Sequence, residues 1–207
     1  RHILKPIQYT SLFLLAIIAL TACSRKKDTF LNKSFHAVST EYNTLFNGNN
    51  AFVQGKEALA QTYRDDFYQI LPVERIEAVD LDGFDTDSKD PNFNTAEEKA
   101  VKAIQKHSMY IGGKEYNPQI DEAYMLLGKA RYYDNRFIPA LDAFNFILNK
   151  SATSNNVNNA KIWKAKTNIR LKNEEYAIEN LQKMLKEENL ADAVVADANA
   201  MLAQAMI

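Results

Sequence analysis

The chain has 207 residues, of which 46% are hydrophobic and 25% are charged, and its formal net charge is -1 at pH 7. This is ordinary globular composition, for one domain or for part of a larger one. The near-neutral charge gives no electrostatic support for nucleic-acid binding. A single cysteine excludes an internal disulfide and a thiolate metal cluster.

The first element in chain order is a short apolar segment that is typical of a secretory signal. Arg1 and Lys5 supply positive charge before an unbroken apolar run over residues 12–20. Two small residues then precede Cys23. The run is shorter than the about 20 apolar residues that span a bilayer stably. We therefore predict a cleaved signal peptide over residues 1–22, with a membrane-spanning helix or an accidental free cysteine as the alternatives.

The end of this segment, Leu20-Thr21-Ala22-Cys23, resembles the lipobox of bacterial lipoproteins. In that family the cysteine is acylated and becomes the first residue of the mature chain, so the resemblance implies lipidation of Cys23. A thiol is a good nucleophile for a diacylglyceryl group, and several acyl chains together give lasting membrane attachment. Residues 23–32 would then form a lipidated tether, in a protein of the periplasm or cell surface.

Residues 33–72 are predicted to form an N-terminal helical hairpin whose apolar faces belong to the core. Apolar residues recur at helical spacing over residues 35–46 and again over residues 52–63. The intervening stretch NGNN, residues 47–50, is typical of a turn with a helix cap. The residues expected in the core are Phe35, Val38, Tyr42, Leu45 and Phe46 of the first helix, and Phe52, Gly55, Leu59 and Tyr63 of the second.

Residues 73–94 are predicted to be an exposed acidic loop. The stretch EAVDLDGFDTDSKD within it holds six acidic residues and one lysine. Its DLDG sequence invites comparison with a calcium loop. With Gly83 at the sixth position, however, Ala78 falls at the first and Lys89 at the twelfth, where carboxylates are required. We therefore interpret the segment as a solvated loop, with weak cation binding left open.

Residues 95–207 contain an internal repeat, which predicts an all-α fold of stacked antiparallel helical hairpins. A shift of 37 residues brings three alanines into coincidence, with larger apolar residues matching on both sides: Ala103, Ala140 and Ala177. Helices pack closely only where side chains are small, so we expect Gly128 to face Ala140 and Ala165 to face the third alanine. Stacking buries the apolar face that one hairpin leaves open. The pattern starts again near the end, so repeats are expected to continue beyond Ile207.

The segment from Glu122 to Leu148 resembles a tetratricopeptide repeat, which implies a right-handed solenoid. The matching positions are Leu127, Gly128, Phe137, Ala140, Phe144 and Ile147. The segment departs from the family pattern because Arg131 stands where a tyrosine is usual and the final proline is missing. The period also exceeds the standard length of about 34 residues.

Several unlinked motifs resemble the start of the SprE/PorW family, which comprises large tetratricopeptide lipoproteins of type IX secretion and gliding motility. They are Phe35-His36, Tyr42-Asn43, Phe46-Asn47-Gly48, the sequence LPVER at residues 71–75, and Lys114-Glu115-Tyr116-Asn117-Pro118. The resemblance implies a non-catalytic scaffold, anchored by lipid in the outer membrane on its periplasmic face. Its partners would be envelope secretion-machinery proteins that link the inner-membrane motor to the outer-membrane translocon.

In tetratricopeptide stacks the first helix of each hairpin lines a concave groove. The repeat register places Lys129, Tyr132 and Tyr133 in this groove from one copy, and Lys166 and Arg170 from the next. Lysines beside tyrosines suit an acidic peptide or a C-terminal carboxylate, through charge-assisted hydrogen bonds and stacking. The alternative is that the lysines are ordinary solubilising surface and the tyrosines belong to the core between repeats.

The sequence contains no nucleophile motif, phosphate-binding glycine loop or metal-ligand spacing, so we expect no enzyme activity, cofactor, metal or small-molecule substrate. We expect His36 and His107 to lie apart and not to form a common site. His107 is expected to pack against other residues, because its repeat equivalents are Phe144 and Leu181. We interpret Gly112-Gly113 as a helix stop.

Three other functions remain open at this point. A SusD-like glycan-binding lipoprotein also contains tetratricopeptide hairpins, but it needs exposed aromatic platforms and the single Trp163 is expected inside. A lipoprotein of outer-membrane β-barrel assembly is built of similar repeats. An envelope hydrolase is the weakest alternative, because its catalytic domain would have to lie elsewhere.

Overall fold

A computed structural model describes residues 25–74, 76, 90–150 and 154–207. The predicted signal peptide, Cys23 and most of the acidic loop lie outside these residues. The described chain is all-α in character, with very little strand. Its helices are α2 (Phe30–Ser39), the π-helical η1 (Thr40–Leu45), α3 (Phe46–Thr62), α4 (Pro91–His107), α5 (Gln119–Tyr133), α6 (Phe137–Lys150), α7 (Ser154–Arg170), α8 (Glu174–Met184) and α9 (Asp192–Met206).

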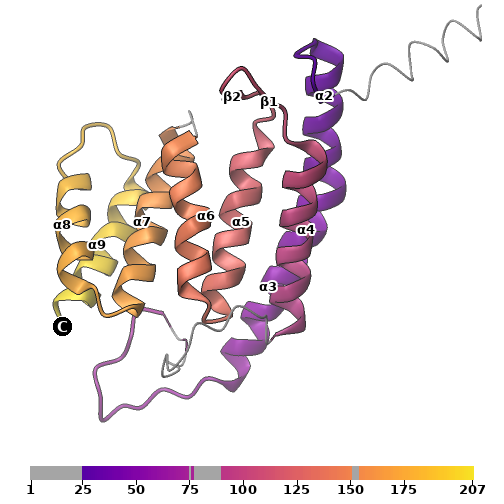
Figure 1. The fold of residues 1–207 in the computed structure, drawn as a ribbon. Coiled ribbons are helices and arrows are strands. Elements are labelled where there is room, and N and C mark those ends of the chain that lie inside the picture. Colours follow the sequence, from indigo (N-terminus) through magenta and orange to yellow (C-terminus); the bar gives the residue numbers. More distant parts are fainter. Residues whose placement is uncertain (1–24, 75, 77–89, 151–153) are drawn as a thin grey trace, which may run out of the picture.

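Consecutive helices from α3 to α9 pack side by side in one continuous row (Figure 1). In addition, α5 contacts both α3 and α7, and α7 contacts α9. The odd-numbered helices therefore form one layer, and α4, α6 and α8 form the other. This arrangement places residues of α5 and α7 next to one another, although α6 separates these helices in the chain.

The repeated alanines lie where the repeat predicts them, in the contacts between helices. Ala103, Ala140 and Ala177 are all completely buried. The atoms nearest to the β-position of Gly128 belong to the ring of Phe144, which lies one turn after the expected partner Ala140 on α6. A β-carbon added at Gly128 would be 2.4 Å from Phe144 Cε1, so the ring from α6 occupies the space that a side chain would need.

The predicted hairpin over residues 33–72 is wrong, because residues 30–62 form one continuous helical segment through α2, η1 and α3. Gly48, which was predicted in a turn, and Gly55, which was predicted in the core, both lie in contacts between helices. A β-carbon on Gly48 would meet Leu126 of α5 at 2.8 Å, and one on Gly55 would meet the ring of Phe93 at 2.7 Å. This long helix packs against α4, with which it forms the first helical pair.

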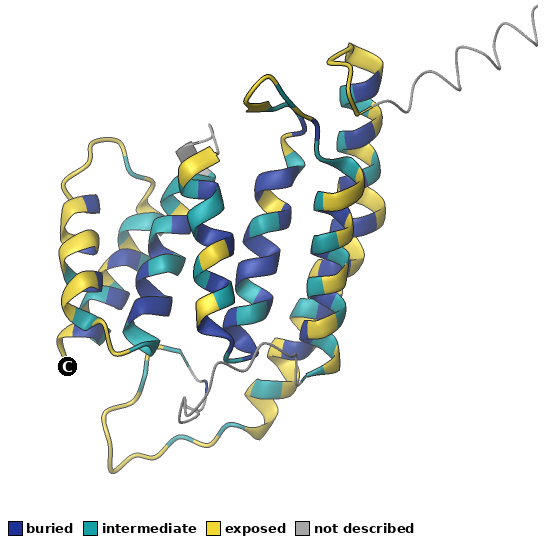
Figure 2. Cartoon of the chain, in the orientation of Figure 1, coloured by how far each residue is buried: buried dark blue, intermediate teal, exposed yellow. Residues whose placement is uncertain are grey.

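Gly55 is buried, and Phe52 and Leu59 pack against the core, as predicted for the second helix. In the first half of the segment, however, the side that faces the core is the opposite of the predicted one. Its predicted core residues are largely exposed: Phe35 by 45%, Val38 by 55%, Tyr42 by 67% and Phe46 by 59%. Leu45 alone of that first set is buried. The buried residues of α2 and η1 are mostly polar: Asn32, His36, Thr40, Thr44 and Leu45. Figure 2 shows exposed residues along the outer side of α2.

The chain after α3 leaves the helical layers and crosses beneath them to the C-terminal end of α7 (Figure 1). Helix α4 starts at Pro91, within the segment predicted as acidic loop. The Asp90 carboxylate caps α4 by accepting from the backbone amides of Asn92 and Phe93, at 2.7 and 3.2 Å, and Pro91 occupies the first turn. Such a cap satisfies amides that have no partner inside the helix.

The interpretation of Gly112-Gly113 as a helix stop is wrong, because α4 ends earlier, at His107. The two glycines form the turn between strands β1 (Tyr110–Ile111) and β2 (Lys114–Glu115), which pair antiparallel. Their φ angles are 58° and 85°. Both values are positive, as a two-residue hairpin turn of this kind requires.

Arg131, which stands where the tetratricopeptide pattern has a tyrosine, connects three helices. Its Nε donates to Glu97 Oε1 of α4 at 2.8 Å, and its Nη1 donates to the carbonyl oxygen of Pro139 in α6 at 3.0 Å. Arg136 also pairs with Glu97. An ion-pair network therefore joins α4, α5 and α6 at the position where the family pattern has a ring.

We predict that Gly128→Ala destabilises the protein. Alanine is favoured over glycine by about 1 kcal/mol inside a helix, so propensity alone predicts a more stable variant. Overlap of the added methyl group with the Phe144 ring should instead lower the free energy of unfolding by about 1–3 kcal/mol. Urea denaturation measures this change, and the additional substitution Phe144→Leu should recover part of it. An alanine variant as stable as the natural chain would contradict the close contact.

Candidate functional site

The predicted groove residues come together in the odd-numbered layer. Lys129, Tyr132 and Tyr133 are spaced by three and four residues on α5, so they lie on one side of that helix. Lys166 and Arg170 lie one turn apart on α7. Because α5 and α7 are in direct contact, the two sets form one cluster, which we call the groove cluster.

The groove cluster holds the carboxylate of Glu74, from the segment that crosses beneath the helices. Lys166 Nζ donates to Glu74 Oε1 at 3.0 Å, and the Tyr132 hydroxyl donates to Glu74 Oε2 at 2.6 Å. Lys166 is only 6% exposed. Both carboxylate oxygens thus accept a hydrogen bond in a site with little water, where charge-assisted hydrogen bonds are strongest.

The backbone around Glu74 is bound as well. We call Pro72–Glu74 together with Ile76 the strap. Arg170 lies 3.4 Å from the carbonyl oxygens of Glu74 and Ile76, to which Nη2 and Nη1 donate. The amide of Val73 donates to Gln204 Oε1 of α9 at 2.7 Å. The strap is therefore held through one acidic side chain and its main chain, and it is bent, since the amide of Ile76 donates to the carbonyl oxygen of Glu74 at 2.9 Å.

Sequence reasoning identified the cations and tyrosines of this site but missed its two carboxylates. Glu74 fell at the edge of the predicted acidic loop, although it belongs to the LPVER sequence at residues 71–75. Asp197 of α9 lies 3.2 Å from Lys166 Nζ through its Oδ1. The only signal in the sequence for the pairing of Glu74 with the groove cations was that its charge is opposite to theirs.

Burial fixes the protonation of the groove tyrosines. Desolvation, followed by the nearby Glu74 carboxylate, raises the pKa of Tyr132 and of Tyr133 far above the ordinary value. Both side chains therefore remain hydroxyl groups that can donate to a carboxylate. Lys129 lies instead over the ring of Trp163, 5.3 Å from its centroid, and burial followed by the charge of Lys166 lowers the pKa of Lys129.

Open space remains beside the strap. A cavity of about 210 Å³ lies between the strap, α5, α7 and α9. Its lining includes Glu74, Tyr132, Ile169, Arg170, Met201 and Gln204. Trp163 is not among the residues that line this cavity, and its ring stacks on that of Phe144 with the centroids 6.0 Å apart. The groove cluster therefore combines fixed donors with room for further ligand atoms.

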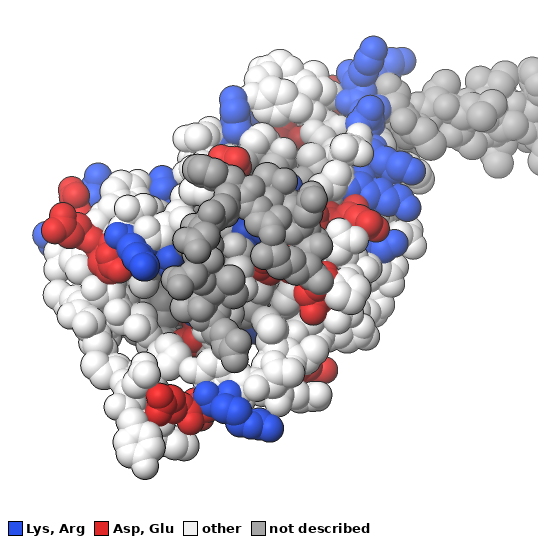
Figure 3. Space-filling view, turned by 60° about the horizontal axis from the view of Figure 1, so that its bottom comes forward, with Lys and Arg blue, Asp and Glu red and all other residues white. Residues whose placement is uncertain are grey.

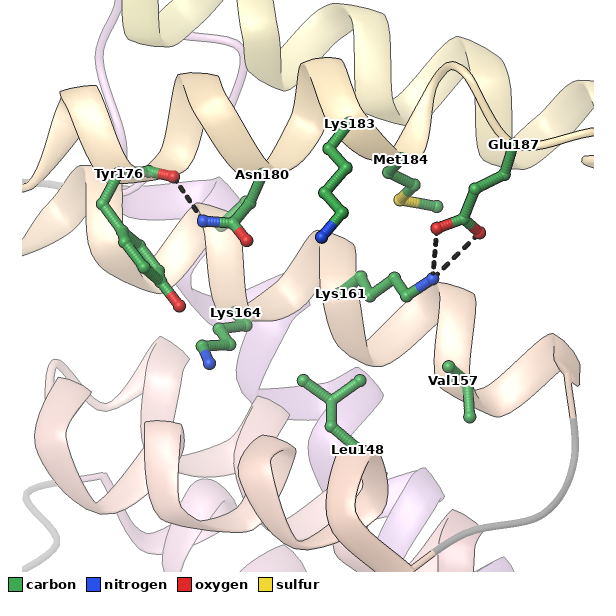
Figure 4. A pocket seen from close by; sticks show the side chains of 10 residues that line it. Leu148, Val157, Lys161, Lys164, Tyr176, Asn180, Lys183, Met184 and Glu187 are labelled. Carbon is green, nitrogen blue, oxygen red and sulfur yellow. Dashed lines mark hydrogen bonds and ion pairs between the residues drawn. The ribbon is translucent and has the colours of Figure 1, made fainter.

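A second hollow lies between α6, α7 and α8 (Figure 4). It has a volume of about 340 Å³ and an apolar floor that includes Leu148 and Met184. Lys161 Nζ pairs with both oxygens of Glu187, at 2.7 and 2.9 Å. That pair is more exposed than the pair formed by Glu74 and Lys166. This hollow is therefore the weaker candidate for recognising an anion.

The structure also brings together the two histidines that the sequence treats as separate. His36 Nδ1 of α2 lies 3.1 Å from His107 Nδ1 at the end of α4. Burial, followed by the charge of Arg25, lowers the pKa of His36, while Glu115 opposes this. Burial and the charges of His36 and Lys106 lower the pKa of His107. Two neutral rings can share one proton between their Nδ1 atoms.

Residues of the LysGluTyrAsnPro motif complete this histidine cluster. Asn117 Nδ2 donates to Thr40 Oγ1 at 3.1 Å and to the carbonyl oxygen of His107 at 3.0 Å. Glu115 accepts from the backbone amide of Met109 at 2.7 Å and from that of Asn117 at 2.8 Å. The cluster thus joins α2, α4 and the start of α5 through polar side chains.

Neither a metal centre nor a membrane span is found in the part of the chain that the structure describes. No three His, Cys, Asp or Glu side chains among these residues are grouped so that they could hold a metal ion. None of the described helices has both the length and the apolar character needed to cross a bilayer. Comparison with known protein families and with curated proteins gives no match to this chain.

We predict strong energetic coupling between Glu74 and Lys166. A double-mutant cycle with Glu74→Gln and Lys166→Met should give a coupling free energy of about 1–3 kcal/mol in urea denaturation. The matched cycle with Glu187→Gln and Lys161→Met should give about 0–1 kcal/mol, because that pair is exposed. Equal coupling free energies in the two cycles would show that burial does not strengthen the interaction between Glu74 and Lys166.

We predict that stability falls as the pH is lowered below the ordinary histidine pKa of about 6.5. His36 and His107 have lowered pKa values in the folded state, so the unfolded chain binds more protons in this range. Urea midpoints at pH 7.5 and pH 5.5 measure the loss. A variant with His36→Gln and His107→Leu should lose less over the same interval, and an identical loss would contradict the assignment.

Proposed function

We propose that this protein is a non-catalytic scaffold that recognises acidic segments of partner proteins in its groove cluster. The observation that carries the proposal is the binding of the strap. Lys166 and Tyr132 hold the Glu74 carboxylate, and Arg170 holds the main chain beside it. A partner segment of the same chemistry can use the same donors in place of the strap, with further room in the adjacent cavity.

We propose a tetratricopeptide-like right-handed solenoid as the architecture of this scaffold. Two observations support it. The repeated alanines are buried between helices, and the odd-numbered helices contact one another while consecutive helices pack in sequence. In such a solenoid the odd layer lines the inner surface, on which the groove cluster lies.

We further propose that the protein belongs with the SprE/PorW lipoproteins and acts in type IX secretion and gliding motility. Two of the motifs that carry this resemblance, Phe35-His36 and residues 114–118, meet in the histidine cluster. Motifs that lie far apart in a sequence are expected to meet in the folded protein when they maintain the same structural feature. The partners proposed are therefore proteins of the envelope secretion machinery.

The proposed location is the outer membrane, on its periplasmic face, through acylation of Cys23. This residue lies outside the described part of the chain, so the support is the lipobox-like sequence. A lipid anchor confines the scaffold to a membrane surface and raises its local concentration near membrane-bound partners.

Affinity purification of the tagged chain from cell envelopes tests these proposals. Arg170→Glu should lower the recovery of partners identified by mass spectrometry, because it places a like charge where an acidic segment binds. Glu74→Gln should raise recovery, because it weakens the strap that occupies the donors. Lys183→Glu, in the second hollow, is the matched control and should leave recovery unchanged.

Cys23→Ser should move the protein from the membrane fraction to the soluble fraction. Retention of this variant in the membrane would contradict the anchor. Partner capture that does not respond to Arg170→Glu would contradict the groove, and recovery of the barrel-insertion complex instead of secretion proteins would contradict the assigned pathway.

A further inference from the structure

The long N-terminal helix presents an apolar ridge to the outside of the molecule. The ridge consists of Leu31, Phe35, Val38, Tyr42 and Phe46, all of which are exposed. The first four are spaced by four, three and four residues, so they form one continuous stripe along α2 and η1. Between Phe30 and Gln54 the only Lys, Arg, Asp or Glu residues are Lys33 and Glu41.

Nothing within the described part of the fold covers this ridge, because the opposite face of the helix makes the contacts with the body. Polar side chains including His36 and Thr40 are buried on that inner face. Residues with large apolar side chains therefore point away from the core, over a length of about 22 Å at 1.5 Å per residue. Exposed apolar stripes of this kind mark interaction surfaces.

Basic residues gather at the same end of the molecule. Arg25, Lys26 and Lys27 precede α2, and Arg25 donates to the carbonyl oxygen of Gln105 near the end of α4. The ammonium of Lys33 lies 4.5 Å from the ring centroid of Tyr116. Figure 3 shows lysine and arginine side chains gathered at this end. Asp28 and Glu41 are the acidic residues between residues 25 and 54.

We propose that the apolar ridge docks on an anionic lipid surface, with α2 lying in the headgroup region. An aromatic and aliphatic stripe flanked by Lys and Arg is the pattern of helices that lie in the plane of a membrane interface. The basic residues complement anionic headgroups. The ridge thus supplies apolar burial, and the residues before it supply electrostatic attraction.

The position of the ridge in the chain supports this occupant, in an argument that depends on the proposed anchor. Fully extended residues span at most about 3.3–3.6 Å each. If Cys23 carries lipid, the start of α2 at Phe30 stays within about 25 Å of the bilayer surface. A lipid surface is then present at high local concentration beside the ridge.

Vesicle co-sedimentation tests the proposal without the anchor. The mature chain, from residue 23 onward and carrying Cys23→Ser, cannot be acylated. It should bind vesicles of equal parts phosphatidylglycerol and phosphatidylcholine, more weakly at high salt, and bind pure phosphatidylcholine vesicles less. The variant Val38→Glu with Tyr42→Glu should lower partitioning by at least about tenfold, because it places charges in the ridge.

The matched control is Ile138→Glu with Tyr176→Glu, which also changes one aliphatic residue and one tyrosine. These residues are exposed by 45% and 44%, but they lie on α6 and α8. The control should partition like the unchanged protein, and circular dichroism should show that both variants remain folded. Equal loss in the two variants would overturn the proposal.

Absence of binding to anionic vesicles would also overturn the proposal. A second result would assign the ridge to contacts between copies of the chain and would overturn the proposal. In that case the protein would not bind vesicles, it would self-associate with increasing concentration in analytical ultracentrifugation, and Val38→Glu with Tyr42→Glu would abolish the self-association. Neither result bears on the anchor, because the protein tested here carries no acyl group.

Discussion

The close approach of neighbouring helices at small residues is the constraint on which the structure depends. Ala103, Ala140 and Ala177 are fully buried, and Gly128 lies directly under a phenylalanine ring. Because the helices are close, alternate helices also touch, and α5 and α7 form a common surface. Tyr132 and Lys166 can bind the same carboxylate only as a result of this contact. The local chemistry of the groove thus follows from packing between repeats.

The groove cluster contains a charged side chain that is buried among its partners. Lys166 is almost inaccessible to water, yet it pairs with Glu74 and Asp197 and lies over the ring of Trp163. An unpaired charge in this position would be strongly destabilising. The strap therefore supplies the buried partner of this charge and links the segment after α3 to α5, α7 and α9.

The sequence predicted the helical repeat, its buried alanines and the side chains of the groove, because these depend on periodicity within one helical unit. It failed for the first half of the N-terminal helix and for the turn that was predicted after it. Gly48 can serve either a turn or a close helix contact, and only the neighbouring Leu126 and Lys99 decide between them. The apolar stripe also identified the wrong inner face, since periodicity shows which residues share a side without showing what covers it. The meeting of His36 with His107 depends on tertiary packing, which no local pattern contains.

The π-helical turn η1 sets the direction in which the first part of the long helix faces. The buried positions within it and on either side of it recur every four residues: Asn32, His36, Thr40, Thr44 and Gly48. A regular α-helix has about 3.6 residues per turn, so such a series would drift around its surface. The wider turn absorbs the excess and keeps these residues in line. Without it α2 would be rotated about its axis by up to about 100°, which is the angle of one residue in an α-helix. The direction in which the exposed side of α2 faces therefore depends on one additional residue in this turn.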